Sequence, residues 1–137
     1  MKINFNSIIF RESQKVYNTK EGVVKEFFDD NNNIIRREEL DTFNRNTDTK
    51  WFDKHGNVTE VLHKDYYKTE NEEGFVETFK SKTQEYTRKS YTKFENGLKH
   101  IIDDFHSKTG KSYFNDFVHN IKGELIEVTT NGTTIKI

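Results

Sequence analysis

The feature that most constrains this chain is a short turn motif that occurs more than once. Residues 52–58 read Phe-Asp-Lys-His-Gly-Asn-Val, and residues 28–34 read Phe-Asp-Asp-Asn-Asn-Asn-Ile. Phe, Asp, Asn and an aliphatic residue recur in register, with Asn32 in the place of Gly56. Asn is the non-glycine residue that best tolerates a left-handed backbone. Both copies therefore predict a tight turn between two strands.

Further turn signals divide most of the chain into short strand-like segments. A weaker copy of the motif occupies residues 120–125, and Asn96-Gly97 and Asn131-Gly132 are typical of two-residue hairpins, whose central positions both need positive φ. We expect polar loops at residues 44–48 and 69–74. We expect strands at residues 8–17, 23–28, 58–67, 75–79, 85–94, 111–119, 123–130 and 133–137.

Two segments fit either a strand or one short helix. Residues 34–43 carry five charges between apolar ends, and they are the segment most compatible with a helix. Residues 98–106 place apolar side chains at helical spacing, but the turn signals on both sides leave only eight or nine residues between them. That short length favours a strand.

Composition supports an all-β fold with a sparse core. Alanine is absent and leucine occurs four times, whereas Phe, Thr, Ile and Val are plentiful, which suits pleated strands and not helices. Without proline, the turns must be made by Gly, Asn and Asp. Only 31 % of residues are hydrophobic against 33 % charged. We predict a single β-hairpin repeat domain over residues 1–137, an antiparallel meander in a curved, mostly open sheet; a barrel or a sandwich is the alternative.

The motif at residues 52–58, aromatic-Asp-x-x-Gly-Asn-aliphatic, is similar to the YD repeats of Rhs-type bacterial proteins. The turn spacing also resembles the hairpin arrays of MORN-like repeats, including the small YwqK-like antitoxins of bacteria. About half of the chain takes part, and Phe28 and Phe52 stand where the YD repeat has Tyr. The resemblance implies a β-hairpin array and a toxin–antitoxin or phage-defence setting, and it carries no catalytic residues.

The sequence favours a reducing, cytoplasmic environment. There is no cysteine for a disulfide framework or a thiolate metal site. Residues 1–10 do not resemble a signal peptide, and no segment approaches the roughly 20 apolar residues of a membrane span. We therefore expect a soluble protein with no membrane partner.

Charge is distributed unevenly and suggests a protein-binding surface. Residues 21–41 contain three basic and seven acidic side chains, whereas residues 80–99 contain six basic and two acidic ones. An acidic stretch can face a basic target, and exposed aromatic residues can anchor a protein interface. The predicted protein-binding residues are Asp29, Asp30, Glu38, Glu39, Trp51, Tyr66 and Tyr67.

The alternative is an RNA or single-stranded DNA platform on residues 86–94, where basic and aromatic residues interleave. Bases would stack on aromatic rings while phosphates meet Lys or Arg. On a strand, Tyr91 shares a face with Lys89 and Lys93, whereas Tyr86, Ser90 and Phe94 lie on the other. The residues assigned to this site are Arg88, Lys89, Tyr91 and Lys93.

A metal-dependent enzyme is the third reading. His100, Asp104 and His106 would share one strand face, and two imidazoles with a carboxylate can bind a divalent cation. No nucleophile elbow, phosphate loop, HExxH or paired-carboxylate motif is present. We therefore expect a protein that is not an enzyme, with no catalytic residues, no cofactor and no metal.

The sequence favours a small non-enzymatic protein that binds another macromolecule. The abundance of Asn, Lys, Ile and Phe is typical of AT-rich bacterial or phage genomes. We expect an inhibitor of a bacterial protein or nucleoprotein: an immunity protein, an antitoxin, or a phage anti-defence factor of the anti-CRISPR type. It would act by steric and electrostatic blocking. A homodimer or the partner would cover apolar side chains on the sheet.

Overall fold

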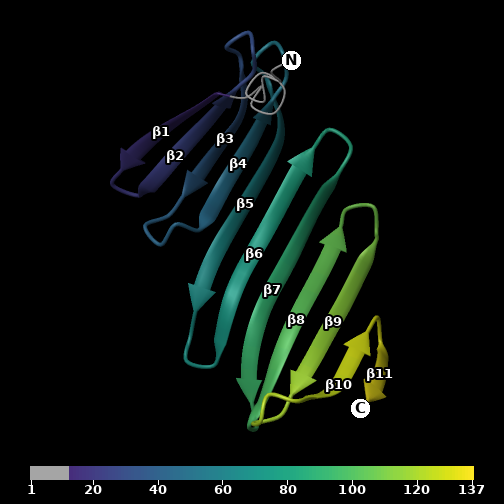
Figure 1. Cartoon of the computed structure of the whole chain (residues 1–137). Helices are drawn as coiled ribbons and strands as arrows, with labels where there is room; N and C mark the ends of the chain where they lie inside the picture. Colours follow the sequence, from purple (N-terminus) through teal and green to yellow (C-terminus); the bar gives the residue numbers. More distant parts are fainter. Residues whose placement is uncertain (1–12) are drawn as a thin grey trace, which may run out of the picture. The chain divides into compact units, whose positions relative to one another are not determined.

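The computed structural model describes residues 13–137, which form eleven β-strands and no helix (Figure 1). Strands that are neighbours in the chain are neighbours in the sheet, from β1 to β11, and β1 does not pair with β11. The predicted all-β antiparallel meander in an open sheet is confirmed. The strands are β1 (Ser13–Thr19), β2 (Gly22–Phe28), β3 (Ile34–Leu40), β4 (Asn46–Phe52), β5 (Val58–Lys68), β6 (Glu72–Ser81), β7 (Glu85–Glu95), β8 (Leu98–Ser107), β9 (Ser112–His119), β10 (Leu125–Thr130) and β11 (Thr133–Lys136).

By its internal contacts the chain divides into two units, Met1–Leu62 and His63–Ile137. The boundary falls inside β5, so the first unit contains β1 to β4 with the start of β5, and the second contains the rest of β5 with β6 to β11. The single β-hairpin repeat domain over residues 1–137 stays a prediction.

The repeated motif forms one turn geometry. In the β4–β5 turn, Asp53 donates its N–H to the Asn57 carbonyl (2.9 Å), and Gly56 donates its N–H to the Asp53 carbonyl (3.0 Å). The Asp53 Oδ1 atom accepts the N–H groups of His55 and Asn57 at 2.9 and 3.0 Å. Gly56 has φ +80°, the left-handed value that a three-residue hairpin loop requires at this position.

The same turn recurs at five connections and includes a copy that the sequence analysis does not predict. Asp29, Asp41 and Asn120 each begin a turn with these backbone and side-chain hydrogen bonds. Ser107 begins a turn with the same backbone bonds, and its Oγ atom accepts the Lys111 N–H and contacts the Thr109 hydroxyl. The copy at Asp41 is hard to recognise because Leu40 replaces Phe and Arg45 replaces Asn. With it, the turn aspartates of the first unit, Asp29, Asp41 and Asp53, follow one another every twelve residues.

Two predicted loops are too long. Because the Asp41 turn closes at Arg45, the strand β4 begins at Asn46, inside the loop predicted at residues 44–48. The loop predicted at residues 69–74 is a tight turn closed by the Thr69 N–H and the Glu72 carbonyl (2.7 Å), so β6 begins at Glu72. In both places, polar residues of types that are common in loops lie on a strand instead.

The two ambiguous segments are strands, so the short helix considered for residues 34–43 is wrong. Those residues form β3 and the start of the next turn, and residues 98–106 lie in β8. Pairing on both sides overrides the helical spacing of β8: Ile101 lies opposite Thr92 on β7 and opposite Phe117 on β9. Of the strand predicted at residues 8–17, only the part from Ser13 onward is described, as β1.

The described residues have a thin core, because each unit is a single layer of strands. Large hydrophobic side chains are exposed in both units, for example Phe43 (77 %) and Ile135 (61 %). No helix among residues 13–137 is long and apolar enough to cross a bilayer. In the described part of the chain, the buried residues are Ile102, Val118, Thr49 and Glu77.

Candidate functional site

The second unit has two distinct faces, because residues directly opposite one another across the ladder point to the same side of the sheet. Glu77 on β6 lies opposite Arg88 on β7, Arg88 opposite Phe105 on β8, and Phe105 opposite Tyr113 on β9. We call this side the Glu77 face. The opposite side, which carries Lys89, is the Lys89 face.

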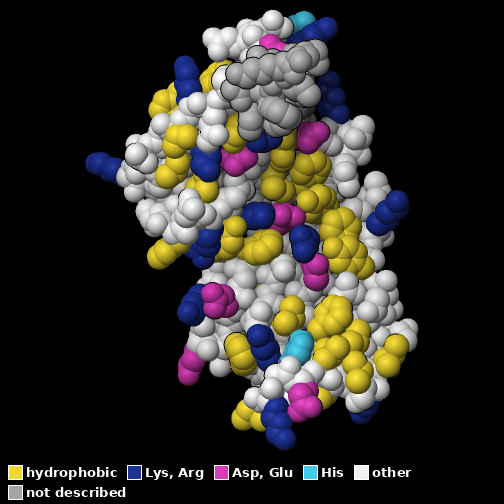
Figure 2. Space-filling view, in the orientation of Figure 1, with side chains coloured by type: hydrophobic (Ala, Val, Ile, Leu, Met, Phe, Trp, Pro, Cys, Tyr) yellow, Lys and Arg dark blue, Asp and Glu magenta, His cyan; other side chains and the backbone are white. Residues whose placement is uncertain are grey.

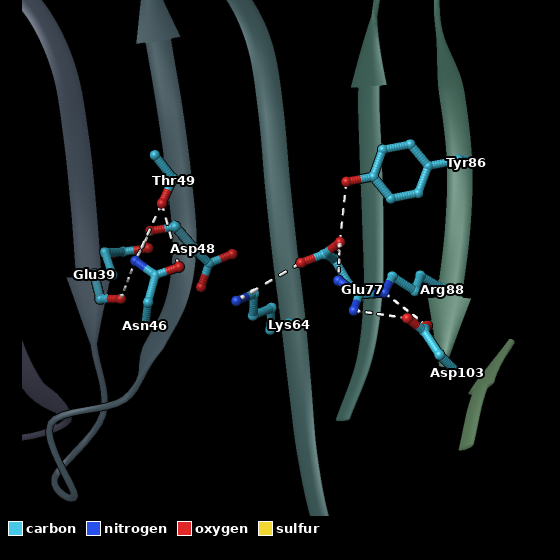
Figure 3. A network of polar contacts seen from close by, with 9 residues as sticks. All are labelled: Glu39, Asn46, Asp48, Thr49, Lys64, Glu77, Tyr86, Arg88 and Asp103. Atoms are coloured by element: carbon cyan, nitrogen blue, oxygen red, sulfur yellow. Dashed lines mark hydrogen bonds and ion pairs between the residues drawn. The ribbon is translucent and has the colours of Figure 1, made fainter. Parts of the chain in front are cut away.

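A network of ion pairs crosses the Glu77 face (Figure 3). Glu77 is 5 % exposed, and its carboxylate lies 3.7 Å from the Lys64 ammonium and 4.0 Å from an Arg88 nitrogen. The same carboxylate accepts a 3.0 Å hydrogen bond from the Tyr86 hydroxyl. Arg88 also binds both oxygens of Asp103, with Nε to Oδ1 at 2.8 Å and Nη2 to Oδ2 at 2.9 Å. Two cations and two carboxylates therefore balance one another on a single face.

The same contacts shift the pKa values of Tyr86 and Arg88. Burial, together with the hydrogen bond to Glu77, raises the pKa of Tyr86 to about 12. The hydrogen bonds to Asp103 raise the pKa of the Arg88 guanidinium above its usual value. Tyr86 thus stays a neutral hydrogen-bond donor and Arg88 a cation near neutral pH, which suits their contacts with Glu77 and Asp103.

Four aromatic rings form a ladder beside this network. Phe79 stacks on Tyr86 with ring centroids 5.2 Å apart, Tyr86 is 5.0 Å from Phe105, and Phe105 stacks on Tyr113 at 4.9 Å. These spacings are typical of favourable aromatic pairs. The ladder joins β6, β7, β8 and β9 on the Glu77 face.

A second apolar group on the Glu77 face is left open, and we call it the apolar row. It consists of Ile101 on β8, Phe117 on β9, Val128 on β10 and Ile135 on β11, each directly opposite the next. Ile101 is 41 %, Phe117 39 % and Ile135 61 % exposed. Figure 2 shows hydrophobic side chains gathered over β9 to β11, separated by polar atoms from the row of blue and magenta charges.

The Lys89 face contains most of the residues predicted to bind nucleic acid. The Lys89 ammonium lies 5.4 Å from the ring centre of Tyr67 and 4.4 Å from that of Tyr91, and 3.3 Å from the Glu72 carboxylate. Lys93 forms a 2.9 Å ion pair with Glu95, which raises the pKa of Lys93. Both lysines of this platform are thus paired with carboxylates.

Arg88 does not belong to that platform, because it lies on the Glu77 face. Adjacent residues of a strand point to opposite sides, so Arg88 and Lys89 cannot contact one ligand from the same face. The structure therefore brings Lys89, Tyr91 and Lys93 together, as the alternation of the strand predicts, and separates Arg88 from them.

In the first unit, the predicted acidic residues do not form one array. Asp29 accepts the N–H groups of Asn31 and Asn33 within its turn, while Asp30 is exposed beside it. Glu38 pairs with Arg36 at 2.9 Å and Glu39 with Arg37 at 3.5 Å. As neighbours on β3, Glu38 and Glu39 point to opposite faces.

The predicted aromatic anchors are all partly buried. Trp51 lies on β4 opposite Arg36, whose guanidinium lies 4.0 Å from the ring centre of Phe27. Tyr66 packs on Phe75 with ring centroids 5.6 Å apart on the Glu77 face. Tyr67, on the other face, donates a 2.6 Å hydrogen bond to Glu72, and burial together with this bond raises the pKa of Tyr67. None of the three projects freely from its unit.

The residues of the metal hypothesis lie on one face, as predicted, but in separate pairs. Asp104 binds His106 at 2.8 Å, whereas His100 binds Asp116 of β9 at 2.9 Å. Asp116 is not among the candidates from sequence, because its proximity to His100 depends on the pairing of β8 with β9. Within residues 13–137, no three His, Asp or Glu side chains cluster closely enough to hold a metal ion.

Neither the apolar row nor Phe43 is predicted from the sequence. The row comes from four strands whose registers cannot be read from spacing alone, although Asn131-Gly132 correctly places Ile135 opposite Val128. Phe43 stands at the tip of the β3–β4 turn, with the Arg45 guanidinium 5.1 Å from its ring centre. Its exposure could be predicted only after Asp41 is recognised as the start of a turn.

Comparison with protein-family models, with curated proteins and with solved structures finds no match to this chain. The resemblance to YD and MORN-like repeats stays a prediction, and the function rests on the geometry of the two faces.

Proposed function

We propose that the protein is a non-enzymatic binding protein whose partner docks on the apolar row of the Glu77 face. The observation that carries this proposal is the exposure of Ile101, Phe117 and Ile135 in one continuous row that no other described element of the second unit covers. Covering apolar side chains stabilises a complex by about 25 cal/mol for each Å² removed from water. Contiguous apolar patches of this kind mark interaction sites.

The surroundings of the row resemble the layout of a protein interface, with an apolar centre and a polar rim. The network of Glu77, Arg88 and Asp103 borders the row, because Asp103 and Ile101 are two residues apart on β8, and its charges are paired within the sheet. A partner that covers the row can therefore leave these ion pairs intact, and it avoids the cost of burying one of these charges without its counter-ion.

We propose that binding inhibits a bacterial protein or nucleoprotein by steric blocking, as an immunity protein, an antitoxin or an anti-defence factor does. The electrostatic part of the expected mechanism has less support. Glu38 and Glu39 each pair with an arginine and face opposite ways, so they do not present a joined acidic surface. A sheet that covers a partner's active surface needs no catalytic residue of its own.

The test is affinity capture from lysate of the source organism with the tagged protein, with and without nuclease treatment. A double variant, Ile101→Ser with Phe117→Ser, removes the centre of the row. Ile121→Ser, at a side chain that is 91 % exposed in the β9–β10 turn, is the matched control. The purified partner is then assayed for its activity with increasing amounts of each variant.

We expect the capture of one partner protein that is retained after nuclease treatment. This partner should bind wild type and the Ile121 variant equally, and it should bind the double variant at least about tenfold more weakly. Its activity should fall in proportion to added wild-type protein. Equal capture by all three proteins would show that the partner uses another surface. A partner whose activity is unchanged would remove the inhibitor part of the proposal.

The second candidate function is binding of single-stranded RNA or DNA on the Lys89 face. The arrangement that favours it is Lys89 between the rings of Tyr67 and Tyr91, since aromatic rings can stack on bases while the ammonium meets a phosphate. Its affinity for an oligonucleotide should fall steeply with salt and fall again in Lys89→Gln. Affinity that is independent of salt excludes this candidate.

A further inference from the structure

We propose that two copies of this chain associate through the outer edges of β11, which pair antiparallel about Ile135 and join their apolar rows into one. In the sheet order, β11 has β10 on one side and no described strand on the other. This inference concerns the outer backbone edge of β11; it shares Ile135 with the proposed partner site, but its hydrogen bonds do not depend on that site.

The hydrogen bonds of the last hairpin show which backbone groups of β11 face outward. Ile137 donates its N–H to the Ile126 carbonyl at 2.9 Å, and β11 pairs with β10 in the register Val128 opposite Ile135. Hydrogen-bonded pairs alternate along an antiparallel ladder, so Ile135 and Ile137 direct their backbone groups toward β10. The N–H and C=O groups of Thr134 and Lys136 therefore point away from β10.

This alternation of inward and outward backbone groups along β11 permits a symmetric antiparallel pair of two β11 strands. If Ile135 lies opposite Ile135 of the second copy, Thr134 lies opposite Lys136 of that copy, and the same holds in reverse. Thr134 and Lys136 would then form the hydrogen-bonded pairs, using the outward groups that β11 offers. The two isoleucines would occupy the non-hydrogen-bonded position, where opposed side chains approach most closely.

Side chains directly opposite in such a pair point to the same side of the sheet. The apolar row of one copy would therefore continue through Ile135 into the row of the second copy. Ile135 is 61 % exposed, so its side chain is free to be covered in this way. An isologous contact of this kind closes after two copies.

The charges and residue types of β11 permit this contact. Its residues are Thr, Thr, Ile and Lys, without the proline or bulge that commonly blocks an edge. The only charged side chain, Lys136, would face a threonine of the second copy and not another lysine. It also has Glu127 directly opposite on its own β10.

The test is sedimentation of the full chain over about 10 µM to about 1 mM, the affinity range expected for an interface this small. Thr134→Pro removes an outward N–H and the 2.9 Å hydrogen bond between the Thr134 and Thr129 hydroxyls. It leaves the backbone hydrogen bonds to β10, because proline is tolerated on an edge strand where its nitrogen faces solvent. Ile135→Thr removes the apolar contact while keeping a β-branched residue. Ile121→Thr, in the exposed β9–β10 turn, is the matched control.

We expect wild type and the Ile121 variant to form dimers, and both β11 variants to raise the dissociation constant about tenfold or more. Amide exchange should slow with concentration at Thr134 and Lys136 and not at Ile135. Wild type that stays monomeric throughout overturns the proposal. Dimers that persist in Thr134→Pro, with protection on the sheet face instead of β11, overturn it as well.

Discussion

The Arg88 guanidinium holds the Asp103 carboxylate by two parallel hydrogen bonds of 2.8 and 2.9 Å, from β7 to β8. Asp103 lies opposite Ser90 and not opposite Arg88, so the contact runs diagonally across the ladder. The other terminal nitrogen of Arg88 reaches Glu77 at 4.0 Å. Arg88 therefore links three strands of the Glu77 face instead of reaching toward a ligand.

Arg88→Lys should destabilise the protein by about 1–3 kcal/mol, although it keeps the positive charge. A lysine cannot form the paired contact with Asp103, and Glu77, at 5 % exposure, would lose part of its compensation. Urea unfolding followed by circular dichroism measures the effect, with Lys122→Ala in an exposed turn as the control. A loss no larger than in the control would show that the network contributes nothing to stability.

Glycine-to-alanine substitution should have very different costs at Gly56 and Gly74. Gly56 has φ +80°, and a Cβ atom there would meet no other atom within 4 Å. Gly56→Ala should therefore cost only backbone strain, about 1 kcal/mol, and Gly56→Asn should cost less because Asn tolerates positive φ better. A Cβ atom at Gly74 would stand 2.2 Å from the Ser90 carbonyl oxygen, so β6 and β7 must separate and the cost should exceed about 3 kcal/mol. Chemical denaturation of both variants tests the ranking, and equal costs would contradict it.

The turn chemistry explains how much of this fold could be predicted from sequence. Asn96-Gly97 and Asn131-Gly132 adopt positive φ at both positions, as their two-residue hairpins require, and they set the registers of β7 with β8 and of β10 with β11. The turn at Asp41 escapes prediction because only its aspartate and Asn44 match the motif. Local residues determine such turns, so their prediction needs no knowledge of packing.

The candidate sites are harder to predict, because side-chain partners come from other strands. Strand alternation correctly places Lys89, Tyr91 and Lys93 on one face, but it cannot show that Glu72 on β6 pairs with Lys89. In the acidic stretch, composition likewise does not reveal that Glu38 and Glu39 form ion pairs with neighbouring arginines. Composition gives the charges, and only the folded geometry shows which of them are already satisfied.

The turn aspartates should make stability depend on pH in the acid range. Backbone N–H groups, chiefly those of Asn57 for Asp53 and Arg45 for Asp41, hold the pKa of each carboxyl below its usual value. A lowered folded pKa gives stability that is present above the unfolded pKa of about 3.9 and is lost as pH falls through the folded pKa. The free energy of unfolding should therefore decline below about pH 4.

The double variant Asp41→Asn with Asp53→Asn should reduce this acid dependence while keeping the turns. The Asn side-chain oxygen can accept the same N–H groups, as Asn120 does from Lys122 and Glu124 at 2.9 and 3.0 Å. Urea unfolding at several pH values between about 3 and 7 provides the measurement. Glu70→Gln in the β5–β6 turn is the control, and a double variant with the same pH profile as wild type would rule the explanation out.

Phe105 and Phe117 lie on the same face and should respond differently to the same substitution. The Phe105 ring contacts Tyr86 and Tyr113 with centroids 5.0 and 4.9 Å away, whereas Phe117 is 39 % exposed in the apolar row. Phe105→Leu should cost about 1–3 kcal/mol through lost ring contacts, and Phe117→Leu about 0.5 kcal/mol or less. Thermal and urea unfolding of both variants give the comparison.

The difference bears directly on the proposed partner site. A side chain kept for binding contributes to the complex more than to the isolated fold, so replacing Phe117 should reduce stability far less than replacing Phe105. If Phe117→Leu destabilised the protein as much as Phe105→Leu, the apolar row would be part of the core of this sheet. The exposed row would then no longer support a docking surface on the Glu77 face.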